Sequence, residues 1–128
     1  MNELKRILYA EDEPDVQTVV ELTVQTMSDY EIKICDNGKK LLENVEEYNP
    51  DLILLDVMMP EMDGPTTFKH LQENEKTKNI PVVFMTAKAQ VHEIETFKET
   101  GVLGVITKPF DPINLCNEIK KIWNGNNE

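Results

Sequence analysis

The chain has 128 residues, of which 40% are hydrophobic and 29% are charged. This length and composition predict one folded domain and argue against a disordered chain. The formal net charge of −11 argues against direct nucleic-acid binding, which needs a basic face, and is compatible with cation binding. No apolar stretch approaches the ~20 residues that span a bilayer, and the first residues lead into a predicted strand rather than a signal sequence. We therefore expect a cytoplasmic protein without membrane insertion, with two reduced, structural cysteines, Cys35 and Cys116.

In the first half of the chain, two strands alternate with two helices. The apolar run Ile7-Leu8-Tyr9-Ala10 predicts the first strand. A helix follows, opened by Asp12-Glu13-Pro14-Asp15, and its apolar stripe at helical spacing is Val16, Val19, Val20, Val24 and Met27. Residues 31–35 predict a strand with one more exposed face, suited to an edge of a sheet. The second helix is marked by Leu41, Leu42 and Val45 and ends before Asn49-Pro50.

The second half continues the alternation. Leu52-Ile53-Leu54-Leu55 predicts a strand buried on both faces, and a turn-rich loop separates it from a helix over residues 66–73. Val82–Met85 predicts the fourth strand, residues 90–100 the fourth helix and Val105-Ile106 the fifth strand. The last helix opens at Asp111-Pro112, and its predicted buried stripe is Leu115, Cys116, Ile119, Ile122 and Trp123.

Five strands that alternate with five helices predict the α/β class. The expected architecture is a doubly wound, five-stranded parallel sheet with strand order 2-1-3-4-5, in a three-layer (βα)5 sandwich. We expect this domain to cover residues 1–124, with residues 125–128 as a frayed tail and no output domain in this chain. A stand-alone protein and a piece of a larger regulator are both compatible with this organisation.

Polar residues follow the predicted strands at the point where each strand ends. Glu11 and Asp12 follow the first strand, Asp56 ends the third, Thr86 follows the fourth, and Lys108 comes just after the fifth. Because the ligand crevice of an open parallel sheet lies at the carboxyl ends of its strands, we expect these side chains to meet there. Each has a simpler interpretation when taken alone: Asp12, for example, could be a helix N-cap.

The charges of these residues predict a chemistry. Three converging carboxylates repel one another unless one is protonated or a cation binds, and all-oxygen ligands favour Mg²⁺. With Lys108 as a positive charge and Thr86 as a hydroxyl donor, the group could hold a phosphoryl group. Asp56 is the best candidate for the nucleophile, because it lies on the central strand and aspartyl phosphates are known covalent intermediates.

Four motifs give the sequence a family resemblance. They are Glu11-Asp12-Glu13-Pro14-Asp15, Leu54-Leu55-Asp56-Val57-Met58-Met59-Pro60-Glu61-Met62-Asp63-Gly64, Met85-Thr86-Ala87 and Thr107-Lys108-Pro109-Phe110. Because these motifs occur in this order and at this spacing, the chain resembles a response-regulator receiver domain of two-component signalling. The resemblance extends from roughly Leu4 to Trp123.

The resemblance implies phosphoryl transfer from a sensor histidine kinase or a phosphotransfer protein to Asp56. It implies Mg²⁺ bound by Asp12, by Glu11 through water, by Asp56 and by the backbone carbonyl of Met58. Lys108 would contact the phosphoryl oxygens, and its peptide bond to Pro109 would be cis. The signal would pass through the face formed by the fourth helix, fifth strand and fifth helix to a protein target or a second copy.

Three departures from the family pattern bear on mechanism. The acidic pair is often two aspartates, but here its first member is Glu11. Val105 stands where many receivers have an aromatic residue that turns inward with Thr86, so an aromatic switch is not expected. Met58 and Lys88 occupy the two positions that tune hydrolysis, and neither orients a water as a carboxylate would. We therefore hypothesise a long-lived phosphoryl group.

Two other classes of function remain as alternatives. One is a receiver-like interaction module that is never phosphorylated. The other is a small phosphohydrolase with an aspartyl nucleophile, but such enzymes place a second carboxylate where this chain has Met58. The expected function is therefore a phosphoacceptor signalling domain rather than a turnover enzyme.

Overall fold

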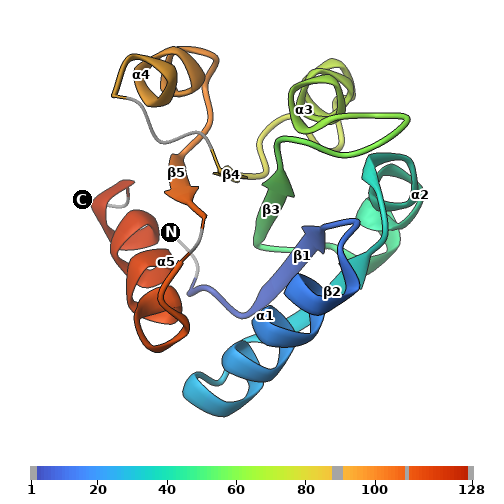
Figure 1. Cartoon of the computed structure of the whole chain (residues 1–128). Coiled ribbons are helices and arrows are strands. Elements are labelled where there is room, and N and C mark those ends of the chain that lie inside the picture. The colour runs from blue at the N-terminus through green and yellow to red at the C-terminus, as the bar shows by residue number, and fades with distance from the viewer. Residues whose placement is uncertain (1–2, 88–90, 109, 127–128) are drawn as a thin grey trace.

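The computed structural model describes residues 3–87, 91–108 and 110–126, and side chains are described for all of these except 91, 92 and 126. It forms five parallel strands in the order β2-β1-β3-β4-β5, as predicted. The strands are β1 (Arg6–Ala10), β2 (Glu31–Cys35), β3 (Leu52–Asp56), β4 (Val82–Thr86) and β5 (Gly104–Thr107). The helices are α1 (Pro14–Met27), α2 (Gly38–Tyr48), α3 (Gly64–Glu73), α4 (Val91–Glu99) and α5 (Pro112–Asn126). Helices α1 and α5 lie on one side of the sheet and the other three helices on the opposite side (Figure 1).

The positions of β3 and β2 in the sheet follow from their sequences. All five residues of β3 are buried, because β3 lies between β1 and β4 and helices cover both of its faces. Strand β2 alternates exposed Glu31 and Lys33 with less exposed neighbours, and it lies at an edge of the sheet, as predicted. Within the described part of the chain, no helix has the length and apolar character of a membrane span.

Alternation along the strands divides the core into two layers. In β1, Ile7 and Tyr9 pack toward α1 and α5, whereas Leu8 and Ala10 pack toward the other helices. The alternation also assigns polar residues to a layer, because a residue two positions after Tyr9 faces the same side. Glu11 therefore faces the layer of α1 and α5.

The apolar stripe of α1 lies on a helix, as its spacing predicted, but it is only partly buried. Val20 and Val24 are fully buried, but Val19 is 41% exposed and Met27 is 52% exposed. Helix α1 contacts the sheet along one side only, and these two residues lie outside that contact. An apolar residue at helical spacing is therefore not always part of the core.

Several helix ends differ from their predicted positions; α4, predicted over residues 90–100, is described over Val91–Glu99. Helix α3 begins at Gly64 rather than at residue 66, because the Asp63 carboxylate caps it by accepting a 2.8 Å bond from the Thr66 N–H. The N-cap of α1 is Glu13, so Asp12 is not used as a cap. Helix α5 continues to Asn126, which includes Gly125 and Asn126 of the segment expected to be frayed.

Candidate functional site

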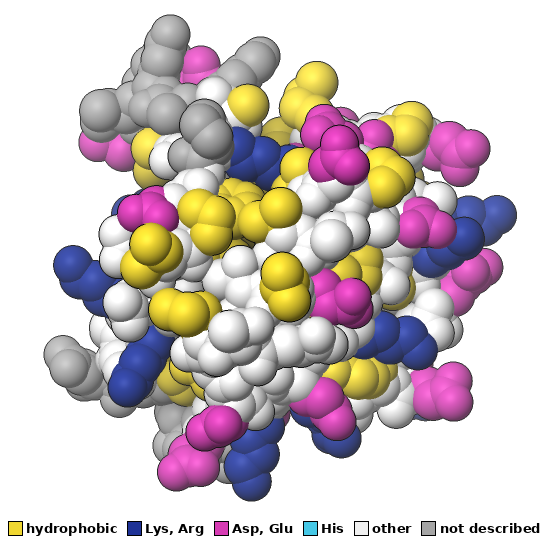
Figure 2. Space-filling model, turned by 60° about the horizontal axis from the view of Figure 1, so that its bottom comes forward, with side chains coloured by type: hydrophobic (Ala, Val, Ile, Leu, Met, Phe, Trp, Pro, Cys, Tyr) yellow, Lys and Arg dark blue, Asp and Glu magenta, His cyan; other side chains and the backbone are white. Residues whose placement is uncertain are grey.

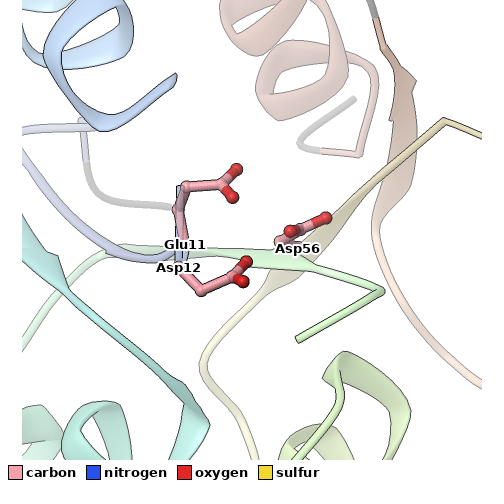
Figure 3. A group of neighbouring side chains, drawn as sticks. All are labelled: Glu11, Asp12 and Asp56. Atoms are coloured by element: carbon pink, nitrogen blue, oxygen red, sulfur yellow. The ribbon is translucent and has the colours of Figure 1, made fainter. Parts of the chain in front are cut away.

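The carboxyl ends of β1 and β3 bring three acidic side chains together. The two strands are neighbours, and Ala10 pairs with Leu55, so the residues that follow, Glu11 and Asp56, lie at the same level. One carboxylate oxygen from each of Glu11, Asp12 and Asp56 lies within 4.8 Å of the others. Figure 3 shows these carboxylates gathered around one point. The sequence prediction that they meet is confirmed.

Lys108 joins this group from the end of β5. Its Nζ donates a 2.7 Å hydrogen bond to Glu11 Oε1 and lies 3.1 Å from Asp56 Oδ1. The lysine side chain is 15% exposed, and both carboxylates are nearly or fully buried. One half-buried ammonium group is thus shared between two buried acids, which restricts its mobility.

The site has unequal acids. Burial, together with the negative charge of Glu11, raises the pKa of Asp56 to about 7 and outweighs the opposing effect of Lys108. Burial also raises the pKa of Glu11, but hydrogen bonds from Lys108 and Tyr9 more than offset it and leave that pKa below its usual value. Glu11 is therefore the acid that stays ionised. Its negative charge repels that of Asp56 and so disfavours the ionised form of Asp56.

Asp12 supplies the observation that fits a metal ion. Its Oδ1 is buried, yet it has no hydrogen-bond partner among the described residues. A buried, unpaired carboxylate oxygen is costly unless something binds it. Together with the nearby oxygens of Asp56 and Glu11, it forms a hard, anionic donor set that suits Mg²⁺.

The loop after Asp56 is held close to the strand ends. The Val57 N–H donates to the Met85 carbonyl at 2.9 Å, and the Gly64 N–H donates to the Val57 carbonyl at 3.0 Å. A Cβ on Gly64 would lie 2.7 Å from the Asp56 carbonyl oxygen, so only glycine allows this approach of α3. The start of α3 therefore fixes the backbone of Asp56.

The remaining predicted residues lie around this centre. Thr86 is 1% exposed at the end of β4, and its carbonyl accepts a 2.8 Å bond from the Lys108 N–H. The Met58 side chain is 65% exposed and lines a cavity of about 500 Å³ together with Asp56 and Lys108. Val105 is partly buried in the opposite layer, where it is paired with Phe84 of β4.

Two predicted features fall outside the described residues. Lys88, expected to tune hydrolysis, and Pro109, expected to follow a cis peptide bond, are not among them. Both expectations stay predictions.

Sequence reasoning did not identify Tyr9 as part of this site. Its buried hydroxyl donates a 2.8 Å hydrogen bond to Glu11 Oε1. The spacing of Tyr9 and Glu11 could have indicated this contact. Residues two apart on a strand face the same side, and a buried tyrosine hydroxyl needs a hydrogen-bond partner. The contact of Lys108 with both Glu11 and Asp56 was also not predicted. It depends on how the ends of β1, β3 and β5 are placed relative to one another in the sheet.

The comparisons with known proteins point to one family. The family model described as the response regulator receiver domain matches residues 7–120. The chain is 33% identical over 119 residues to the DNA-binding dual master transcriptional regulator RpaA of a Synechocystis species. It is 34% identical over 118 residues to the phosphate regulon transcriptional regulatory protein PhoB of Escherichia coli. These alignments cover 93% and 92% of this chain but 49% and 51% of the two relatives, so the chain spans about half of their length.

Solved structures agree with this match. A putative response regulator from Chloroflexus aurantiacus superimposes with a TM-score of 0.84 at 26% identity, covering 95% of this chain and 99% of that one. The chemotaxis response regulator CheY4 of Vibrio cholerae also reaches a TM-score of 0.84, at 24% identity over 94% of this chain and 99% of that one, which supports the shared fold. The chain belongs to the response regulator receiver domain family, whose members are the phosphoacceptors of two-component signalling.

Proposed function

We propose that Asp56 is the phosphoacceptor of this chain and that a sensor histidine kinase or a phosphotransfer protein is the donor. The observation that supports this most is the placement of Asp56, buried at the end of the central strand, 3.1 Å from Lys108 Nζ. A carboxylate held beside a lysine ammonium, with two further acids within reach of one cation, matches the needs of phosphoryl transfer, which depends on positioning and electrostatics.

The chemical step uses groups that are already in place. An Asp56 carboxylate oxygen forms a bond to phosphorus, while the bond from phosphorus to the donor's nitrogen breaks and the donor keeps the electron pair. Lys108 transfers its contact from Asp56 to a phosphoryl oxygen and keeps its bond to Glu11. The Thr86 hydroxyl donates to another phosphoryl oxygen. Bound Mg²⁺, held by Asp12, Asp56, the Met58 carbonyl and, through water, Glu11, would offset the phosphoryl charge.

The surface beside the site suits a donor protein. The exposed apolar residues Leu22 of α1 and Ile113 of α5 line one hollow, and Val19 of α1 lines the neighbouring cavity at Asp56. Figure 2 shows hydrophobic side chains gathered in the middle of this face of the molecule. A donor that reaches Asp56 has to cover this cavity, so its apolar surface would pack on α1 and the start of α5.

The output would leave from a different face. Lys98 of α4, Val105 of β5 and Lys121 of α5 line a hollow of about 390 Å³. In a chain with a net charge of −11, these lysines favour an acidic segment of a protein target or of a second copy. With Val105 at this face, the signal would be transmitted without an aromatic switch.

Phosphorylation by a small donor tests the proposal. The protein is incubated with acetyl phosphate and Mg²⁺, and its intact mass is measured over time. We expect a gain of one phosphoryl group in the wild type, no gain in Asp56→Asn and a strongly reduced gain in Asp12→Asn. Asp29→Asn, which changes an exposed acid in the turn between α1 and β2, is the matched control and should behave as the wild type.

The outcome also separates the alternatives. No gain in the wild type, with acetyl phosphate or with a kinase, would favour an interaction module that is never phosphorylated. Continuous hydrolysis of a phosphomonoester would instead indicate a phosphohydrolase.

A further inference from the structure

Tyr9 is a fully buried aromatic residue whose hydroxyl reaches the candidate site from inside the core. Its ring packs in the layer between the sheet and helices α1 and α5, and the residue is 0% exposed. The hydroxyl donates a 2.8 Å hydrogen bond to Glu11 Oε1. A phenol at this depth would be costly without an acceptor, so the bond fixes the ring and the carboxylate together.

Three donors hold the Glu11 carboxylate. Oε1 accepts from both the Tyr9 hydroxyl and Lys108 Nζ, and Oε2 accepts from the Glu13 N–H at 3.2 Å. Glu11 is itself 0% exposed, so bulk water does not readily replace a donor that is lost. The position of this carboxylate is therefore set by these bonds, and the position of Lys108 is set by the carboxylate.

We propose that Tyr9 is a positioning residue for phosphoryl transfer, which orients Glu11 and through it holds Lys108 beside Asp56. This inference rests on the proposed role of Asp56 as phosphoacceptor. Without the hydroxyl, Oε1 keeps Lys108 as its remaining donor, and the glutamate can rotate away from the core. Lys108 Nζ, 2.7 Å from Glu11 Oε1, would follow that rotation and leave its place 3.1 Å from Asp56.

The pairing of Tyr9 with a glutamate is specific to the length of that side chain. An aspartate at position 11 is one methylene shorter, so its carboxylate would be withdrawn from the Tyr9 hydroxyl. Tyrosine at position 9 should then contribute nothing to the site. The effect of Tyr9 is therefore expected to depend on Glu11, whereas a role limited to core packing would not depend on it.

A double-mutant cycle tests this dependence. The variants are Tyr9→Phe, Glu11→Asp and the two together, and the rate of phosphorylation by acetyl phosphate is measured at saturating Mg²⁺. We expect Tyr9→Phe to slow the wild type about tenfold, which corresponds to about 1.4 kcal/mol. In the Glu11→Asp protein, the same substitution should change the rate by less than about twofold.

Tyr48→Phe is the matched control. The Tyr48 hydroxyl is also buried but has no hydrogen-bond partner among the described residues. Its removal should leave the phosphorylation rate unchanged. Equal slowing by Tyr9→Phe in both backgrounds, or no slowing in either, would overturn the proposal.

A second measurement does not depend on phosphorylation. The Lys108 ammonium group is held between two buried carboxylates, so its protons should exchange slowly with water and give an NMR signal in the metal-free protein. We expect Tyr9→Phe to speed this exchange at least about tenfold and Tyr48→Phe to leave it unchanged. If the wild type gains no phosphoryl group, the proposed function fails, and this exchange rate still decides whether Tyr9 positions Lys108. Unchanged exchange in Tyr9→Phe would show that it does not.

Discussion

Replacing Asp56 by asparagine should stabilise the metal-free protein at neutral pH. Asp56 is 4% exposed and shares its surroundings with ionised Glu11, which together raise its pKa to about 7. A folded-state pKa above the ordinary value of 3.8 means that folding favours the protonated carboxyl. The contribution of Asp56 to stability is therefore greatest below pH 3.8 and is lost as the pH rises to about 7. Asparagine has no charge to desolvate, so it avoids this loss.

The size of the gain follows from the pKa. The rise from 3.8 to about 7 is about 3 units, and at about 1.4 kcal/mol per unit this gives about 4 kcal/mol as an upper limit. Lys108 loses one of its two carboxylate partners in the variant, which opposes the gain. We expect Asp56→Asn to raise the free energy of unfolding by about 2–4 kcal/mol above pH 7.

Urea unfolding at a series of pH values, with a chelator present, measures this effect. The difference in free energy of unfolding between Asp56→Asn and the wild type should be near zero at about pH 4 and should grow up to about pH 8. Asp29→Asn should show no such growth. Mg²⁺ should stabilise the wild type and reduce the difference, because a bound cation relieves the same repulsion. A variant that is less stable than the wild type at neutral pH would show that the Asp56 charge does not destabilise the metal-free fold.

Three further predictions concern the loop and the phosphoryl group, and a substitution in α5 serves as a control for the first. Gly64→Ala should lower the free energy of unfolding by roughly 1–3 kcal/mol, because its Cβ meets the Asp56 carbonyl. Gly125→Ala has open space around its Cβ and should leave stability equal or raise it by up to about 1 kcal/mol in thermal unfolding. Asp63→Ala removes the cap of α3 and should cost about 1 kcal/mol in the same assay, and an unchanged midpoint would contradict the cap's role. Met58→Asn should speed the loss of the phosphoryl group several-fold in a time course of intact mass, since an amide there can orient water; an equal lifetime would contradict the predicted tuning role.

The fold could be predicted because the sequence pattern and the packing agree. The apolar run at Leu52–Leu55 predicted a strand covered on both faces, and β3 is the central strand. The alternation in residues 31–35 predicted an edge, and β2 is there. The spacing of Val19 and Met27 predicted a helix, and both lie on α1. Both are exposed, because spacing does not say how much of a helix's apolar side the sheet covers.

The acidic centre could be predicted in outline but not in detail. The positions of Glu11, Asp12 and Asp56 at strand ends were sufficient to predict that they converge. Which acid is ionised depends on burial and on the donors around each carboxylate, and these arise only when the strands are in register. The Tyr9 hydroxyl and Lys108 are two such donors, and neither contact was predicted from the sequence.

Mapping the modified residue decides whether Asp56 accepts the phosphoryl group. The protein is phosphorylated with acetyl phosphate and Mg²⁺, the acyl phosphate is reduced with borohydride, and the peptides are sequenced by mass spectrometry. We expect homoserine at position 56 and unmodified aspartate at position 12. A phosphorylated protein whose reduced residue lies anywhere other than position 56 would contradict this expectation.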